Sequence, residues 1–189
     1  MNELFPIFVK MDTIRTLVVG AGPVGLEKLQ AILKSSPRAQ VDVVAREVDE
    51  ETRIFIDSHE TVSLYRKAFE ESDLDHKDLV ILATNNSALN ERIRTFAKER
   101  HILLNVADKP ALCDFYLGSV VQKGNLKVGI STNGKSPTMA KRLKEFFNDL
   151  LPEEIDETLQ LMHTYRNRLK GDFKEKVVAL NKHTRDALF

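Results

Sequence analysis

The 189-residue chain lacks the residues that build disulfide frameworks, clustered metal centres and membrane spans. Its single cysteine, Cys113, excludes an internal disulfide and any zinc site made from several cysteines. The five histidines are scattered, with no pair at metal-ligand spacing, so no metal site is predicted. No apolar run is long enough to cross a bilayer, so no membrane partner is expected.

The chain also lacks an excess of charge, since 28 basic residues balance 28 acidic ones. Nothing global therefore favours nucleic acid or an anionic membrane, and nucleic acid is not an expected partner. Local basic clusters can still bind an acidic small molecule. The first residues carry neither the basic region nor the long apolar core of a signal peptide, so a reducing cytoplasm is the expected location.

Short apolar runs alternate with helical patterns through the first part of the chain. Strands are predicted at 14–19, 41–45, 61–66, 78–84 and 102–108, with residues 5–9 (FPIFV) as a candidate edge strand. Helices are predicted at 24–33 and 90–100. This alternation is typical of an α/β protein with a Rossmann-type parallel sheet covered on both faces.

The pattern changes after Pro110. Two β-type runs, 115–122 and 126–132, flank Lys123-Gly124-Asn125 and predict a β-hairpin. A helix is predicted over 138–150, with Ser136 as its N-cap and Pro137 as its first residue. Two further helical patterns, separated by Gly171-Asp172, form an α-helical C-terminal tail.

We therefore predict three parts: an NAD-binding Rossmann domain (1–112), a dimerisation region of hairpin and helix (113–150) and a C-terminal helical domain (151–189). An isolated hairpin is marginally stable in water and exposes edges that a second copy can pair. A homodimer built largely by residues 113–150 follows from this.

The glycine-rich turn Gly20-Ala21-Gly22-Pro23-Val24-Gly25 follows a strand and opens a helix. In a dinucleotide-binding turn the first glycine allows a tight bend, the second admits the pyrophosphate, and the third permits close helix–strand contact. The helix N-terminus then offers free N–H groups and a partial positive charge to the phosphates. This context favours dinucleotide binding over the alternative, a purely structural turn.

Two other strand ends carry candidate cofactor contacts. After the second strand, Arg46 suits a 2′-phosphate and Glu47 suits a ribose, which leaves NAD and NADP open on the residues alone. After the fourth strand, Thr84 would face the cofactor together with the two asparagines that follow it. The alternative for that group is an ordinary helix cap.

The fifth strand runs into Asp108, at the edge where parallel sheets bind ligands. Asp108 is a candidate acid/base group, and the alternative is a turn aspartate before a proline. Lys109 either holds Asp108 ionised or is solvated. The second candidate is Gly134-Lys135-Ser136-Pro137-Thr138, an anion site at a helix start, with Lys141 and Arg142 nearby. Its alternative is a capped helix with a solvated basic face.

Four segments together resemble the precorrin-2 dehydrogenases, the NAD-dependent enzymes of sirohaem synthesis that also form the N-terminal module of bifunctional sirohaem synthases. They are LVVGAGPVGLEK, DLVILATNNSALN, NVADKPALCDF and ISTNGKSPTMAKRLKE, and the resemblance covers about residues 5–170. It implies oxidation of precorrin-2 to sirohydrochlorin with NAD⁺, and in some members Fe²⁺ insertion. It also implies a homodimer joined through the hairpin region.

Carried over residue by residue, the resemblance places cofactor contacts on Pro23, Val24, Arg46 and Glu47, and the functional aspartate on Asp108. Thr132 stands where some members carry serine. Pro23 replaces an aspartate or alanine of several relatives, and Leu117-Gly118-Ser119 replaces a proline-bearing run.

Precorrin-2 carries many carboxylates, so cations are needed to bind it. The predicted substrate-binding residues are Lys135, Ser136, Lys141 and Arg142. Two other functions stay open: a non-catalytic NAD-sensing domain, and a chelatase in which the dehydrogenase role is minor.

Overall fold

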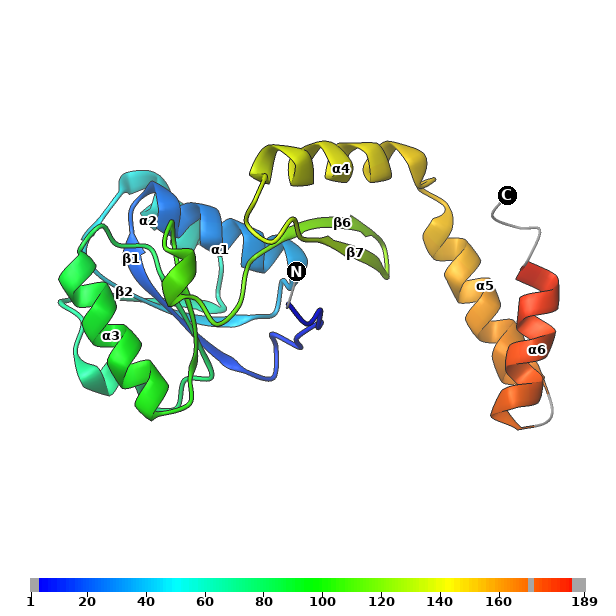
Figure 1. Ribbon diagram of the computed structural model, residues 1–189, viewed down its shortest axis with the longest axis horizontal. Coiled ribbons are helices and arrows are strands. Elements are labelled where there is room, and N and C mark those ends of the chain that lie inside the picture. Colours follow the sequence, from blue (N-terminus) through cyan, green and yellow to red (C-terminus); the bar gives the residue numbers. More distant parts are fainter. Residues whose placement is uncertain (1–3, 170–171, 185–189) are drawn as a thin grey trace. The chain divides into compact units, whose positions relative to one another are not determined.

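The computed structural model describes residues 4–169 and 172–184, which fall into two compact units, Met1–Leu117 and Gly118–Phe189 (Figure 1). The earlier division into 1–112, 113–150 and 151–189 stays a prediction. Among the described residues, no helix is both long and apolar enough to traverse a bilayer.

The first unit is built on a five-stranded parallel sheet in the order β3-β2-β1-β4-β5, as in the Rossmann fold. Its strands are β1 (Arg15–Ala21), β2 (Gln40–Val48), β3 (Val62–Arg66), β4 (Leu79–Leu82) and β5 (Leu103–Val106). Its helices are α1 (Pro23–Ser35), α2 (Glu50–Asp57) and α3 (Ser87–Glu99), with short 3-10 turns η1 (Glu71–Leu74) and η2 (Pro110–Leu112). The predicted α/β Rossmann-type fold is confirmed.

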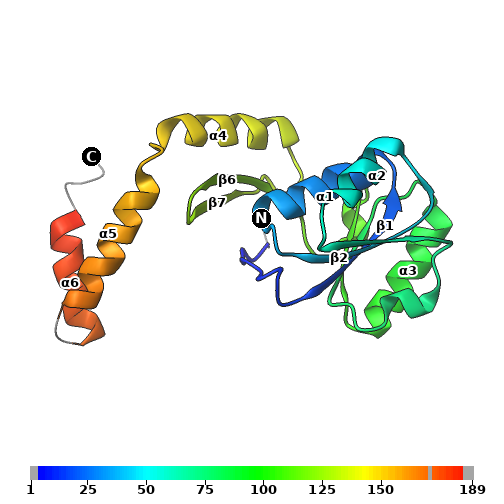
Figure 2. The same cartoon turned by 180° about the vertical axis from the view of Figure 1, so that it is seen from behind.

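The apolar runs form central strands because both faces of this sheet are covered, as Figures 1 and 2 show. On one face Val18 and Val43 pack with Leu29 of α1 and Ile56 of α2. On the other face, side chains of the same strands pack with α3 around the fully buried Ile93. Side chains that alternate between the two faces of each strand therefore form two cores. The packing of these cores holds the carboxyl ends of β1, β2 and β4 side by side.

One expectation about the first unit is wrong, and one helix was missed. Residues 5–9 form no strand, so β3 and β5 are the edges of the sheet. Pro6 has no N–H to donate to a ladder, and Phe5 and Phe8 lie exposed. Helix α2 was not expected at all, because its polar eight residues bury little more than Thr52 and Ile56.

The second unit begins with the predicted hairpin, in which β6 (Ser119–Lys123) and β7 (Leu126–Ile130) pair antiparallel around Gly124 and Asn125. Helix α4 (Pro137–Leu150) starts where predicted, since the Ser136 hydroxyl accepts the Met139 N–H at 3.1 Å. Helices α5 (Ile155–Arg168) and α6 (Phe173–Thr184) follow, as predicted. Gly171, which was expected to separate these two helices together with Asp172, lies outside the described residues.

The hairpin turn and the start of α5 are joined by Asp156. Its carboxylate accepts hydrogen bonds from the Asn125 backbone N–H at 2.7 Å and from the Asn125 side chain at 2.8 Å. These bonds lower the pKa of Asp156 below its ordinary value. The almost buried Lys123 forms an ion pair with Glu153 just before α5. The hairpin is therefore secured within its unit by the chain that follows α4.

Candidate functional site

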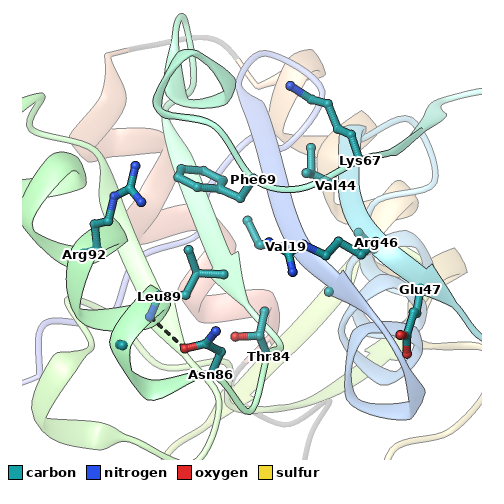
Figure 3. A pocket seen from close by; sticks show the side chains of 13 residues that line it. Val19, Val44, Arg46, Glu47, Lys67, Phe69, Thr84, Asn86, Leu89 and Arg92 are labelled. Atoms are coloured by element: carbon teal, nitrogen blue, oxygen red, sulfur yellow. Dashed lines mark hydrogen bonds between the residues drawn. The ribbon is translucent and has the colours of Figure 1, made fainter.

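Two cavities open at the carboxyl edge of the parallel sheet. The larger, of about 470 Å³, lies over the ends of β1 and β2 and the start of α3 (Figure 3). Its lining is Val19, Gly20, Val44, Ala45, Arg46, Glu47, Lys67, Phe69, Thr84, Asn86, Ala88, Leu89 and Arg92. The smaller, of about 150 Å³, is lined by Val24, Ala83, Thr84, Asn85, Ala107, Asp108 and Lys109. Thr84 borders both cavities.

The glycine turn passes between these cavities, since Gly20 lines the larger and Val24 the smaller. Gly20 has a φ of +108°, and a methyl group there would lie 2.4 Å from the Ala83 carbonyl oxygen. A methyl group on Gly25 would lie 2.2 Å from the Gly20 carbonyl oxygen. These two glycines let α1 approach β1 and β4 closely.

Gly22 differs from both, because a methyl group there would meet only the Asp49 carboxylate, at 3.9 Å. The side of Gly22 that would carry a side chain is therefore open. Gly22 is also the N-cap of α1, whose first N–H groups have no partner within the helix. Pro23, the first helical residue, has no N–H, which leaves Val24 to offer the first one. Open space beside free amides fits a pyrophosphate.

The two candidates at the end of β2 differ in orientation. Both are exposed and line the larger cavity. Figure 3 shows the Arg46 side chain extending toward Val19, whereas the Glu47 carboxylate turns away from it. Arg46, and not Glu47, therefore reaches across the cavity.

The loop between β4 and α3 forms the helix cap considered for it, whereas a contact of Thr84 with the cofactor stays a prediction. Asn86 is a helix cap, since its side chain accepts the Leu89 N–H at 3.0 Å. Thr84 donates its hydroxyl to Asn90 at 2.8 Å, and the Asn90 amide donates back to the Thr84 carbonyl at 3.0 Å. Asn90 is 1% exposed, so these two bonds to a buried side chain hold the half-buried Thr84 at the edge of both cavities.

Asp108 lies exposed at the smaller cavity with a φ of +59°, in the left-handed region. Such a conformation is uncommon outside glycine, and it is found most often at turns and functional sites. Lys109 does not pair with it, because its ammonium donates to the Ser87 hydroxyl at 2.6 Å. Lys109 is therefore neither the ionic partner of Asp108 nor a purely solvated side chain, the two alternatives considered for it.

The loop that carries Asp108 is fastened to β5 by Cys113. The Cys113 thiol accepts the Val106 N–H at 3.2 Å and donates to the Val106 carbonyl. Burial raises the pKa of this thiol, so it stays protonated at neutral pH. The Asn105 side chain donates to the Phe115 carbonyl at 2.9 Å, further along the same loop.

Asp114 ties the loop to α3. Its carboxylate accepts hydrogen bonds from Arg94 at 2.5 Å and from the Leu104 N–H at 3.0 Å. Burial acts to raise the pKa of Asp114, but these two bonds and the charge of Arg94 outweigh it and lower the pKa below its ordinary value. The pair therefore stabilises the folded chain while Asp114 is ionised.

Asp114→Ala is expected to lower the free energy of unfolding by about 1–3 kcal/mol at neutral pH, because Arg94 and the Leu104 N–H lose their acceptor. The folded pKa lies below the unfolded one, so this contribution is present above the ordinary pKa and is lost as the pH falls through the lowered one. Urea unfolding at neutral and acidic pH measures it, with the exposed Asp75→Ala as the control. A difference that stays constant into acid would contradict this account.

The predicted substrate-binding residues all lie in the second unit. Lys135 is exposed in the turn before α4, and Lys141 and Arg142 are exposed on that helix. Arg142 approaches Glu145 at 3.4 Å. Ser136 is the α4 N-cap, and its backbone N–H and carbonyl are both bonded to the Thr132 hydroxyl. Their assignment to substrate binding stays a prediction.

Several residues of the larger cavity were not predicted from the sequence. Lys67 and Phe69 follow β3, and Leu89 and Arg92 come from the first turns of α3. Lys67 is held by Glu70 at 2.9 Å and Asp73 at 2.8 Å. Because β3 also ends at the ligand-binding edge of the sheet, the residues that follow it could have been predicted as cavity residues.

Comparisons with known proteins agree with this geometry. The family described as "Putative NAD(P)-binding" matches residues 7–119, and the one described as "Sirohaem biosynthesis protein central" matches residues 123–149. The sirohaem synthase of Baumannia cicadellinicola is 35% identical over 168 residues, and that of Zymomonas mobilis 33%. These alignments cover 89% of this chain and 36% and 35% of the relatives, so the chain spans about a third of their length.

A solved structure, "SirC, precorrin-2 dehydrogenase", has a TM-score of 0.75 and 25% identity, and the match covers 98% of this chain and 92% of that one. A glycine turn with an open second position, between two cavities at the carboxyl edge of a parallel sheet, defines a Rossmann-type nucleotide-binding protein. The chain belongs to the family described as "Putative NAD(P)-binding", and residues 123–149 in addition match the sirohaem biosynthesis central family. The predicted family resemblance and the nicotinamide dinucleotide cofactor are confirmed.

Proposed function

We propose that the chain oxidises precorrin-2 to sirohydrochlorin with NAD⁺. The observation that carries this proposal is the likeness to a precorrin-2 dehydrogenase along almost the whole of both chains. The open Gly22 position supports the cofactor, because it leaves room where a pyrophosphate would bind. A non-catalytic NAD-sensing domain would share the glycine turn but would leave Asp108 without a role.

The two cavities suggest how the cofactor is held. The adenosine half would occupy the larger cavity, with Arg46 and Glu47 at its border. The pyrophosphate would lie at Gly22, against the N–H groups of Val24 and Gly25. The nicotinamide half would then lie toward the smaller cavity, beside Thr84 and Asp108. When bound, NAD⁺ supplies the acceptor for a hydride leaving the substrate.

Asp108 acts in this proposal as the general base. Loss of a hydride leaves the tetrapyrrole with a positive charge, and a proton must also leave to complete the oxidation. An exposed carboxylate at the cavity mouth can stabilise that charge and accept the proton. Lys135, Lys141 and Arg142, with the Ser136 helix start, would bind substrate carboxylates.

An anaerobic assay of precorrin-2 with NAD⁺ and NADP⁺ in parallel tests the proposal. The expected products are sirohydrochlorin and reduced cofactor, with the higher kcat/KM for NAD⁺. Ferrous iron added afterwards measures whether the chain also inserts the metal into sirohydrochlorin. Cofactor binding without any reduction in the presence of precorrin-2 would favour the sensing function instead.

The chain is expected to form a homodimer largely through residues 113–150, which include the hairpin and α4. Helix α4 buries Ala140 within that unit, while Met139, Phe146 and Leu150 are 54%, 56% and 61% exposed. An apolar surface of this kind on a helix marks an interaction site.

Light scattering at micromolar concentration is expected to give twice the monomer mass. Phe146→Asp is expected to shift the chain toward the monomer, because it places a charge in the apolar contact. Asn148→Asp adds the same charge at an exposed polar position of α4 and is the control. A monomer mass for the unmodified chain would contradict the dimer.

A further inference from the structure

The larger cavity carries more positive charge than its carboxylate balances. Its lining holds three cations, Arg46, Lys67 and Arg92, against the single carboxylate of Glu47. Lys67 is already bound to two acidic side chains of the loop that follows it. The charge that remains for a ligand therefore belongs to the two arginines.

Neither arginine is neutralised within the part of the chain that the structure describes. No carboxylate there lies within ion-pair distance of Arg46 or Arg92. Arg92 instead lies 5.4 Å from the centre of the Phe96 ring on its own helix. Two guanidinium groups, from β2 and from α3, thus border one cavity without an anionic partner.

At the end of β2 a cation, and not a carboxylate, extends across the larger cavity. An acidic side chain at this position binds the adenosine ribose hydroxyls, and its charge would repel a 2′-phosphate. Here the buried Ala45 is followed, still within β2, by Arg46 and then by Glu47. Arg46 extends toward Val19, and the carboxylate of Glu47 turns away (Figure 3).

We propose that Arg46, assisted by Arg92, forms a subsite for the 2′-phosphate of NADP⁺, so that the chain binds NADP⁺ as well as NAD⁺. This rests on the proposed function, because it places the adenosine half of the cofactor in the larger cavity. A guanidinium suits the task, since its planar fork donates two hydrogen bonds to one phosphate and stays charged at every relevant pH.

Calorimetric titration of the unmodified full chain with NAD⁺ and with NADP⁺ tests the subsite without any need for the tetrapyrrole. Both are expected to bind, with Kd values within about 10-fold of each other. Arg46→Ala is expected to weaken NADP⁺ binding by roughly 10- to 100-fold, as for loss of charge-assisted hydrogen bonds. NAD⁺ binding should be weakened by a clearly smaller factor than NADP⁺ binding, and Arg92→Gln should produce a smaller loss of NADP⁺ binding in the same direction.

Arg66→Ala is the matched control. Arg66 is an exposed arginine at the same end of the neighbouring strand, paired in register with Ala45, and it does not line the cavity. Its replacement should leave both affinities unchanged. A chain that binds NAD⁺ but not NADP⁺ would overturn the subsite alone.

Equal weakening of both cofactors by Arg46→Ala would also overturn the subsite, and would assign Arg46 to the shared adenosine. Failure of the unmodified chain to bind either cofactor would overturn the proposed function and the subsite with it.

Discussion

Gly22→Val is expected to abolish NAD⁺ binding in a chain that still folds. The valine side chain would fill the open space beside the first N–H groups of α1, where the pyrophosphate belongs. Gly22 has a φ of −87°, which valine adopts without strain, and the added Cβ would meet only the Asp49 carboxylate at 3.9 Å. Calorimetry should detect no NAD⁺ binding, while circular dichroism and thermal unfolding should resemble those of the unmodified chain.

Gly25→Val separates this effect from general damage to the turn. Its Cβ would lie 2.2 Å from the Gly20 carbonyl oxygen, a backbone atom that cannot move without separating α1 from β1. This variant is expected to lose its folded structure as well as its cofactor. If a folded Gly22→Val chain bound NAD⁺ normally, the turn would be structural only.

The glycine turn shows why part of the fold was predictable. Gly20, Gly22 and Gly25 indicate a strand before the turn and a helix after it. This motif can be recognised because its glycines lie within six residues of sequence. The Ser136–Pro137 junction is equally local, because a cap bond joins residues three apart. Such elements were placed to within one or two residues.

Elements that depend on distant partners were less predictable. The run FPIFV has the composition of a strand, yet a strand needs a neighbour, and Pro6 removes one ladder donor. Helix α2 is short and polar, and it is held by the burial of Thr52 and Ile56 against the sheet. The local signals that pointed to it were Asp49 at the N-cap position and the acidic Glu50 and Glu51 in the first turn.

Some residues of the candidate site were likewise predictable from the sequence, and others were not. The motif and strand-end rules led to Gly22, Arg46, Thr84 and Asp108, all of which border the cavities or lie between them. The contribution of Arg92 depends on how α3 packs across the sheet, which no local pattern encodes. The direction of the Glu47 side chain also follows from the folded strand and not from its position in the sequence.

Asp108→Ala is expected to lower the rate of precorrin-2 oxidation by about 10²–10⁴-fold, the usual contribution of a general base. NAD⁺ binding should be nearly intact, because Asp108 borders the smaller cavity from the end of β5, whereas the pyrophosphate is proposed to bind at Gly22. Steady-state kinetics under anaerobic conditions, with calorimetry for the cofactor, measure both quantities. Asp75→Ala, which removes an exposed aspartate of the same unit, should leave both unchanged.

The backbone at Asp108 requires a second variant. Its φ of +59° is tolerated by asparagine and disfavoured by alanine, so alanine adds strain to the loop in addition to removing the carboxylate. Asp108→Asn keeps the shape and the backbone conformation but cannot accept the proton. Asp108→Gly removes the carboxylate without strain and completes the series.

If proton acceptance is the main role, the asparagine variant should be nearly as impaired as the alanine and glycine variants. An active asparagine variant beside inactive alanine and glycine variants would mean that Asp108 orients the substrate and that water or another group takes the proton. Impairment confined to alanine would trace the loss to the strained loop, since glycine lacks the carboxylate equally. Normal turnover in all three would remove Asp108 from the mechanism, and its left-handed backbone would then serve only the turn between β5 and η2.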